Sequence, residues 1–161
     1  MRIQDSVDVA LSQVVSSLPH PIVGLALVTD TDIQTLHAMA LSRSYLLQHS
    51  NDPDLLWMPV DWDLELDPPG FDQASIDLEK AFGPEAPGGY KKRATRACNA
   101  LMEGLQRLQQ TAPELREYYM TVIATDSGEL WGTLEGQVVL SLNGAEVAER
   151  WQRWRQSWLG E

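Results

Sequence analysis

The chain has 161 residues, of which 43% are hydrophobic and 22% are charged, so we expect one domain of ordinary globular composition, and disorder of the whole chain is excluded. It carries 23 acidic residues against 12 lysines and arginines, a net charge of -11 at neutral pH. Because affinity for nucleic acid comes from basic side chains that neutralise phosphates, this charge argues against DNA or RNA as a direct ligand.

The first helix is predicted from Ile3 to Leu18, where apolar residues recur at steps of three and four. Arg2, Gln4 and Asp5 interrupt any apolar run of the length that a secretory signal needs. No window approaches the ~20 apolar residues of a membrane span, and anionic lipid headgroups repel an acidic protein. The sequence therefore predicts a cytoplasmic protein with no membrane association.

Two strands joined by a short polar turn are predicted next. The run from Ile22 to Val28 is β-branched or apolar at most positions, it breaks at Thr29-Asp30-Thr31-Asp32, and apolar residues resume from Ile33 to Ala40. Ser42 is placed to cap a short helix that extends to His49, because a serine hydroxyl can accept a hydrogen bond from an unpaired amide of the first turn.

The most unusual stretch is the acidic segment, residues 51–86, which contains ten acidic residues and one lysine. It therefore holds a net charge of -9, from ten negative and one positive side chain. Like charges held close together destabilise the compact state, so a cationic partner is the expected compensation. The alternative is internal pairing with the basic first turns of the following helix, namely Lys91, Lys92, Arg93 and Arg96.

Within the acidic segment, Leu55 to Leu66 has an apolar residue at every second position, and from Val60 onward these residues alternate with Asp61, Asp63, Glu65 and Asp67. If this part is extended, its period of two turns the carboxylates to one face and the apolar side chains to the other. A short helix is predicted from Phe71 to Phe82, with Ile76 and Leu78 as its anchors. The glycines and prolines of residues 83–89 then indicate a loop inside the domain.

The alternate carboxylates from Asp61 to Asp67 resemble the start of a calcium-binding loop. Such a loop needs glycine at its sixth position and glutamate at its twelfth, whereas counting from Asp61 gives Leu66 and Asp72. Acid and base catalysis by paired carboxylates needs two contrasting environments, which a solvated acidic face does not provide. No metal site is predicted here.

The strongest helix prediction covers Tyr90 to Gln110, and the single cysteine, Cys98, lies on its apolar side, where we expect a buried and inert thiol. One cysteine excludes an internal disulfide and a multi-thiolate zinc site. The three histidines have neither the HExxH spacing nor a nucleophile signature beside them; they are His20, His37 and His49. The sequence therefore predicts no catalytic residue and no cofactor, and a protein that is not an enzyme.

The last third of the chain predicts a strand over Tyr118 to Ala124 and a helix from Leu130 to a left-handed cap at Asn143-Gly144. A final helix is expected to pack on the core through an amphipathic stripe formed by Val147, Trp151, Trp154 and Trp158. The whole chain, residues 1–161, is thus predicted to be a single α+β domain with a small, mainly antiparallel sheet packed with several helices.

Several stretches carry a family resemblance. Ile22–Asp30 is a strand ending in a Thr-Asp turn, Leu56–Trp62 contains a Trp-x-Pro-x-Asp-Trp element, and Thr121–Asp126 precedes a helix ending in Leu140–Asn143. Together they resemble the bacterial domain-of-unknown-function family 4303. The likeness covers most of residues 22–154, although Gly144 stands where the family pattern leads us to expect proline.

Members of this family resemble the SUKH-type immunity proteins in genomic setting. They are small cytoplasmic proteins encoded beside polymorphic toxins or type VI secretion effectors. The resemblance implies neutralisation of a toxin and adds no catalytic residue.

We therefore expect an immunity protein whose acidic surface occludes a basic cleft of a cognate toxin effector. The expected contact residues are five carboxylates with one of two tryptophans as an aromatic anchor, namely Asp61, Asp63, Glu65, Asp67 and Asp72 with Trp57 or Trp62. Two other classes stay open. One is a small enzyme, carboxylate- or metal-dependent, that uses the same carboxylates, and the other is an adaptor or scaffold domain whose aromatic C-terminal helix binds a partner.

Overall fold

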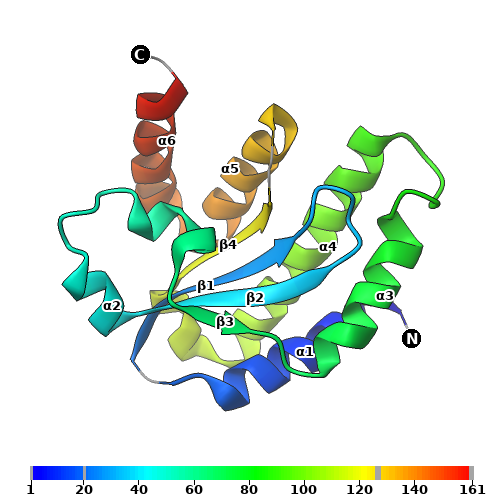
Figure 1. Cartoon of the computed structure of the whole chain (residues 1–161), viewed down its shortest axis with the longest axis horizontal. Helices are drawn as coiled ribbons and strands as arrows, with labels where there is room; N and C mark the ends of the chain where they lie inside the picture. The colour runs from blue at the N-terminus through cyan, green and yellow to red at the C-terminus, as the bar shows by residue number, and fades with distance from the viewer. Residues whose placement is uncertain (1, 20, 126–127, 160–161) are drawn as a thin grey trace.

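In the computed structural model the chain forms a four-stranded sheet that is covered on both faces (Figure 1). The structure describes residues 2–19, 21–125 and 128–159. The strands are β1 (Ile22–Thr29), β2 (Leu36–Ser42), β3 (Leu64–Leu66) and β4 (Tyr119–Ala124), in the order β3-β2-β1-β4. The β1–β2 and β2–β3 pairs are antiparallel, whereas β1 and β4 are parallel. The predicted α+β class with a mainly antiparallel sheet is confirmed.

Six α-helices and three 3-10 turns complete the described part of the chain, and each predicted helix is present. Ser42 Oγ accepts from the Tyr45 amide at 3.1 Å, as expected for the cap of the second helix. The helices are α1 (Ile3–Ser17), α2 (Arg43–Gln48), α3 (Gly70–Phe82), α4 (Tyr90–Thr111), α5 (Glu129–Asn143) and α6 (Ala145–Leu159), and the turns are η1 (Leu55–Trp57), η2 (Pro59–Asp61) and η3 (Pro113–Glu117).

One face of the sheet is covered by α1, α3 and α4, with α5 alongside β4 (Figure 1). Leu25 and Leu27 of β1 pack there against Leu11, Phe71 and Leu101 of the three helices, and all five side chains are buried. Burial of each such side chain is worth roughly 1.5–3 kcal/mol. The apolar stripes of these helices therefore supply most of the hydrophobic core.

The other face of the sheet is closed largely by aromatic rings. Trp62 lies against β1 so closely that a Cβ on Gly24 would come within 2.8 Å of its ring. The Trp62 indole N–H donates to the Leu55 carbonyl at 2.9 Å, and Trp57 and Trp151 extend the same cluster. The predicted packing of the last helix on the core is confirmed for Trp151, which is 2% exposed.

The alternating segment from Leu55 to Leu66 is not one extended strand. Only Leu64–Leu66 pairs with β2, and two 3-10 turns occupy most of the rest. A strand would place Trp57 and Trp62 on opposite faces, since Trp62 lies five positions after Trp57 and side chains alternate between faces at each position. The turns bring both indoles onto the sheet and leave Val60, expected on the apolar face, 49% exposed. Burial of two indoles thus overrides the period of two.

The anchors of α3 are only partly as predicted. Leu78 is fully buried, but Ile76 is 58% exposed. The helix instead buries Phe71, Ala74, Leu78 and Phe82, which recur at steps of three and four along one helical face.

Asn143 closes the outer edge of β4. Its side-chain Oδ1 accepts from the Met120 amide at 2.8 Å, and its Nδ2 donates to the carbonyls of Met120 at 2.7 Å and Val139 at 3.0 Å. The side chain thus pairs with an edge strand as a neighbouring strand would. Gly144 follows with φ of 85°, which confirms the predicted left-handed cap of α5.

Replacing Asn143 by alanine should lower the free energy of unfolding by about 2–3 kcal/mol, because three hydrogen bonds of roughly 1 kcal/mol each are lost. Urea denaturation followed by circular dichroism measures the change. Ser141→Ala is the control, since Ser141 is exposed on the same helix. A loss no larger than that of the control would contradict the role given to Asn143.

Candidate functional site

The five predicted contact carboxylates lie along one border of the sheet. We call Asp61, Asp63, Glu65, Asp67 and Asp72 the acidic edge. They extend from η2 through β3 to the first turn of α3, and β3 is the last strand on its side of the sheet. All five side chains are exposed.

Four of the five carboxylates have no partner among the described residues. Asp63 is the exception, since its two oxygens accept from the Ser42 amide at 2.9 Å and from the Ser42 hydroxyl at 2.6 Å. Asp63 therefore fixes the residue that caps α2. Among the described residues the other four make no side-chain hydrogen bond and no ion pair, so their charges face solvent.

The alternative of internal pairing with the basic turn of α4 is not what the structure contains. The ion pairs of the described chain join Arg2 to Asp5 and Arg107 to Asp8, outside the acidic segment. Arg93 instead donates to main-chain carbonyls at the end of α3 and in the loop after it, and its partners are the oxygens of Phe82, Gly83 and Gly88. The helix C-terminus therefore compensates this cation.

The two tryptophans proposed as anchors are part of the core. Trp57 is 7% and Trp62 is 4% exposed, so they offer little surface to a partner. Their indoles close the second face of the sheet, which is why they are buried. Among the tryptophans, the exposed side chain is Trp158, near the end of α6, whose exposed fraction is 62%.

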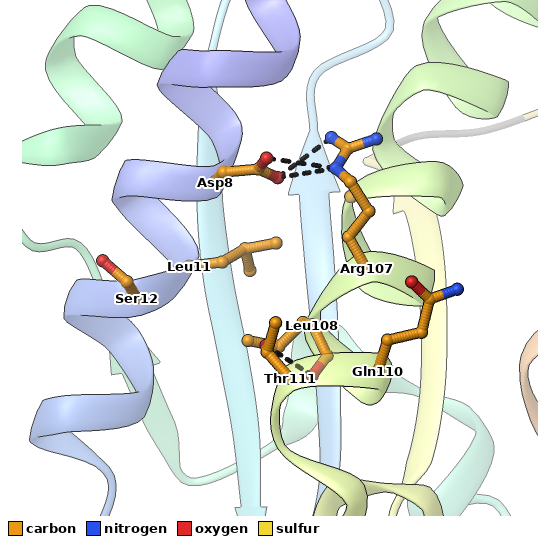
Figure 2. A pocket seen from close by; sticks show the side chains of 8 residues that line it. Asp8, Leu11, Ser12, Arg107, Leu108, Gln110 and Thr111 are labelled. Atoms are coloured by element: carbon orange, nitrogen blue, oxygen red, sulfur yellow. Dashed lines mark hydrogen bonds and ion pairs between the residues drawn. The ribbon is translucent and has the colours of Figure 1, made fainter.

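A hollow of about 390 Å³ lies between α1 and α4 (Figure 2). Asp8 and Arg107 point toward each other across it, and Arg107 Nη2 lies 2.9 Å from Asp8 Oδ1. Because these two charges neutralise each other, the hollow presents no free ionic group for recognition of a ligand.

A second cluster of polar groups is buried between β4, α5 and α6, and the sequence analysis missed it. Its centre is Glu135 of α5, which is 9% exposed. Tyr119 and Thr121 of β4 and Trp151 of α6 are buried on the same side of the sheet, and Arg155 of α6 acts on the Glu135 carboxyl by its charge. We call these five residues the Glu135 cluster.

Burial raises the pKa of Glu135 to about 7. The Arg155 guanidinium and the Trp151 indole oppose this shift, but they only partly offset the loss of hydration. Burial, with the charge of Glu135 added, also raises the pKa of Cys98 to about 12 and that of Tyr119 well above its usual value. The predicted burial of the cysteine is confirmed.

Three other polar atoms of the cluster have no hydrogen-bond partner within the described ranges: Tyr119 Oη, Thr121 Oγ1 and Trp151 Nε1. Trp151 is near enough to Glu135 to lower its pKa, without reaching the geometry of a direct bond. Each unsatisfied buried group costs roughly 1–3 kcal/mol. Buried polar atoms that lack hydrogen-bond partners, next to a carboxyl whose pKa is strongly raised, are typical of a functional site.

The cluster opens into a cavity of about 210 Å³ at the carboxyl end of β4. Glu135 and Arg155 line it on one side, with Trp57 and Trp154 among the apolar walls. Arg155 can take this position because residue 132 is glycine; a Cβ there would collide with the guanidinium. The site thus depends on close packing between α5 and α6.

Sequence reasoning missed Glu135 because a charged residue beside an apolar helical stripe is expected to face water. A usable signal was nearby in Gly132 and Gly136, which are four residues apart on α5. Two glycines at that spacing indicate a helix face that packs closely against a neighbour, here against Arg155 and Trp151.

Comparisons with family models, curated proteins and solved structures found no match. The resemblance to family 4303 therefore stays a prediction. No helix of the described chain is long and apolar enough to cross a membrane, and its histidine, cysteine and acidic side chains form no group of three or more that could hold a metal ion. His20 lies outside the residues described.

Replacing Glu135 by glutamine should stabilise the protein at alkaline pH. The folded state keeps the Glu135 proton up to about pH 7, whereas the unfolded chain loses it near 4.5, so the wild type loses stability as pH rises through this interval. A shift of two to three pH units corresponds to roughly 3 kcal/mol. Urea denaturation should therefore favour Glu135→Gln by up to about that amount near pH 8.5, with the difference vanishing near pH 4.5.

Glu129→Gln is the matched control, because Glu129 is exposed in the first turn of the same helix. Its stability should follow the wild-type dependence on pH. Parallel curves for wild type and Glu135→Gln would contradict the assignment of the shifted carboxyl.

Proposed function

We propose that this protein is an immunity protein that acts in the bacterial cytoplasm and neutralises a cognate toxin effector through its acidic edge. The observation that carries the proposal is that Asp61, Glu65, Asp67 and Asp72 are exposed and have no partner in the described chain. A cationic surface on another protein supplies the opposite charges that the described residues do not place beside these carboxylates.

Electrostatics supports a binding role for this border of the sheet. Mutual repulsion of the four carboxylates opposes folding, and the described residues place no cation against them. A basic partner relieves the repulsion, and the complementary potential raises the rate of association. If the basic surface is a substrate cleft, the acidic edge occupies the place of an anionic substrate.

Apolar contacts are available beside the charges. Val60 precedes Asp61 and is 49% exposed, and Ile76, one turn after Asp72, is 58% exposed. Interfaces combine apolar with polar contacts, so each of these side chains can add an apolar contact next to a carboxylate. They replace the buried tryptophans as the expected apolar anchors.

Co-expression with the product of the adjacent gene, followed by co-purification, tests the proposal. The key variant combines Asp61→Asn, Glu65→Gln, Asp67→Asn and Asp72→Asn, and leaves Asp63 in place because it supports α2. At low salt it should bind the partner about tenfold or more weakly, with a flatter dependence on salt. Its thermal stability should be unchanged or slightly higher, because no internal pair is lost.

The matched control removes four exposed acidic charges elsewhere, by Glu→Gln at Glu103, Glu114, Glu117 and Glu146. It has the same net charge as the key variant, so it separates local contacts from the overall field. Equal affinities for wild type and key variant, or equal losses in the key variant and the control, would overturn the assignment of the acidic edge.

A further inference from the structure

The cavity beside Glu135 holds two opposite charges that do not pair with each other. Glu135 and Arg155 both line it, and the ion pairs of the described chain do not include them. The two groups are near enough for Arg155 to lower the pKa of Glu135. Their separation leaves a positive and a negative group side by side, both available to a ligand.

The remaining walls of the cavity are apolar and aromatic, with Trp57, Trp154 and Ile123 among them. The indole N–H of Trp154 is occupied, because it donates to Asp54 Oδ1 at 2.8 Å. Its ring therefore serves as an apolar surface. At about 210 Å³ the cavity is smaller than the ~300–1,000 Å³ of pockets for drug-sized ligands, which restricts the occupant to a small molecule.

Simple ions fit this pair of charges poorly. An anion is attracted by Arg155 and repelled by ionised Glu135, whereas a cation is attracted by ionised Glu135 and repelled by Arg155. A neutral apolar molecule leaves both charges without partners, at the desolvation cost of buried ionic groups. A molecule that carries a cationic group and an anionic group close together, next to an apolar group, matches Glu135, Arg155 and the apolar walls at the same time.

We propose that this cavity binds a free α-amino acid with an apolar side chain. Its ammonium group bonds to the Glu135 carboxylate, its carboxylate bonds to the Arg155 guanidinium, and its side chain lies against Trp57 and Trp154. The inference goes beyond the neutralising function and does not depend on it.

The position in the fold supports the assignment. Ile123, Ala124 and Thr125 place the cavity at the carboxyl end of β4, which runs parallel to β1. In open α/β sheets, ligands bind outside the carboxyl ends of the parallel strands, and β1 and β4 are the parallel pair of this mainly antiparallel sheet. Hydrogen bonds hold the rim, since the Thr125 amide donates to Thr29 at 2.9 Å and Thr31 Oγ1 donates to the Thr125 carbonyl at 2.6 Å.

Isothermal titration calorimetry of the full chain near pH 8 with L-phenylalanine and L-leucine tests the proposal. One-to-one binding of at least one of them is expected. Two matched probes each lack one charge: 3-phenylpropionate has no ammonium group, and 2-phenylethylamine has no carboxylate. Each should bind at least about tenfold more weakly than L-phenylalanine, because a charged hydrogen bond is lost. Absence of binding by both amino acids at millimolar concentration, or equal binding of either truncated probe, overturns the proposal.

Two variants connect binding to the named groups. Glu135→Gln and Arg155→Gln should each weaken amino-acid binding at least about tenfold. The controls Glu129→Gln and Arg153→Gln alter exposed residues of the same two helices and should bind as the wild type does. Circular dichroism shows whether each variant is folded. If Arg155→Gln does not fold, Gly132→Ala replaces it, because the added methyl group displaces only the flexible end of Arg155. Folded variants with wild-type affinity overturn the proposal.

The dependence on pH gives a separate readout. The charged or titratable groups coupled to Glu135 are Arg155 from α6, whose charge lowers the pKa of Glu135, and Tyr119 from β4 and Cys98 from α4, whose pKa values burial and the charge of Glu135 raise. Between about pH 5.5 and 8 Glu135 changes charge, whereas the raised pKa values of Tyr119 and Cys98 keep those two groups neutral. Binding of L-phenylalanine should therefore weaken toward pH 5.5 in the wild type, because the carboxyl must lose its proton to hold the ammonium group. An affinity that does not change with pH overturns the contact between them.

Discussion

Burial of the central strand on both of its faces is the constraint on which the rest of this structure depends. Seven of the eight residues of β1 are buried, so each face of the sheet needs an apolar cover. Three helices cover one face, whereas indole rings together with residues of α5 and α6 cover the other. The tight fit of Trp62 over Gly24 requires the two 3-10 turns, and these turns set where the acidic edge begins.

The two covers differ in what they leave inside. On the helical side most of the buried side chains are aliphatic, and they pack with the aromatic rings of Phe71, Phe82 and Trp131. On the aromatic side, rigid rings and a short strand leave room for Thr121, the Tyr119 hydroxyl and the Glu135 carboxyl, with a cavity next to them. Low local hydration then raises the pKa of Glu135. This region holds Tyr119 Oη, Thr121 Oγ1 and Trp151 Nε1, which are three of the five buried side-chain atoms of the described residues that lack a hydrogen-bond partner.

The sequence was sufficient for elements whose burial follows a regular period. The stripes of α1 and α4, the Ser42 cap and the Gly144 cap depend on neighbouring residues, and their predictions are confirmed. The parallel pairing of β4 with β1 depends on segments distant in the chain, which local patterns do not encode. The exposure of the acidic edge could be predicted because charged side chains favour water. The burial of Glu135 could not, because it depends on the packing of α6 beside Gly132.

One short turn serves both regions of interest. η2 contributes Pro59 and Val60 to the wall of the cavity and ends at Asp61, the first carboxylate of the acidic edge. A protein docked on Asp61 and a small molecule seated against Pro59 would therefore contact the two ends of one three-residue turn. If either shifts this turn, thermodynamic reciprocity requires that each changes the affinity of the other by the same factor. The concentration of the small molecule would then change the affinity of the protein for its partner.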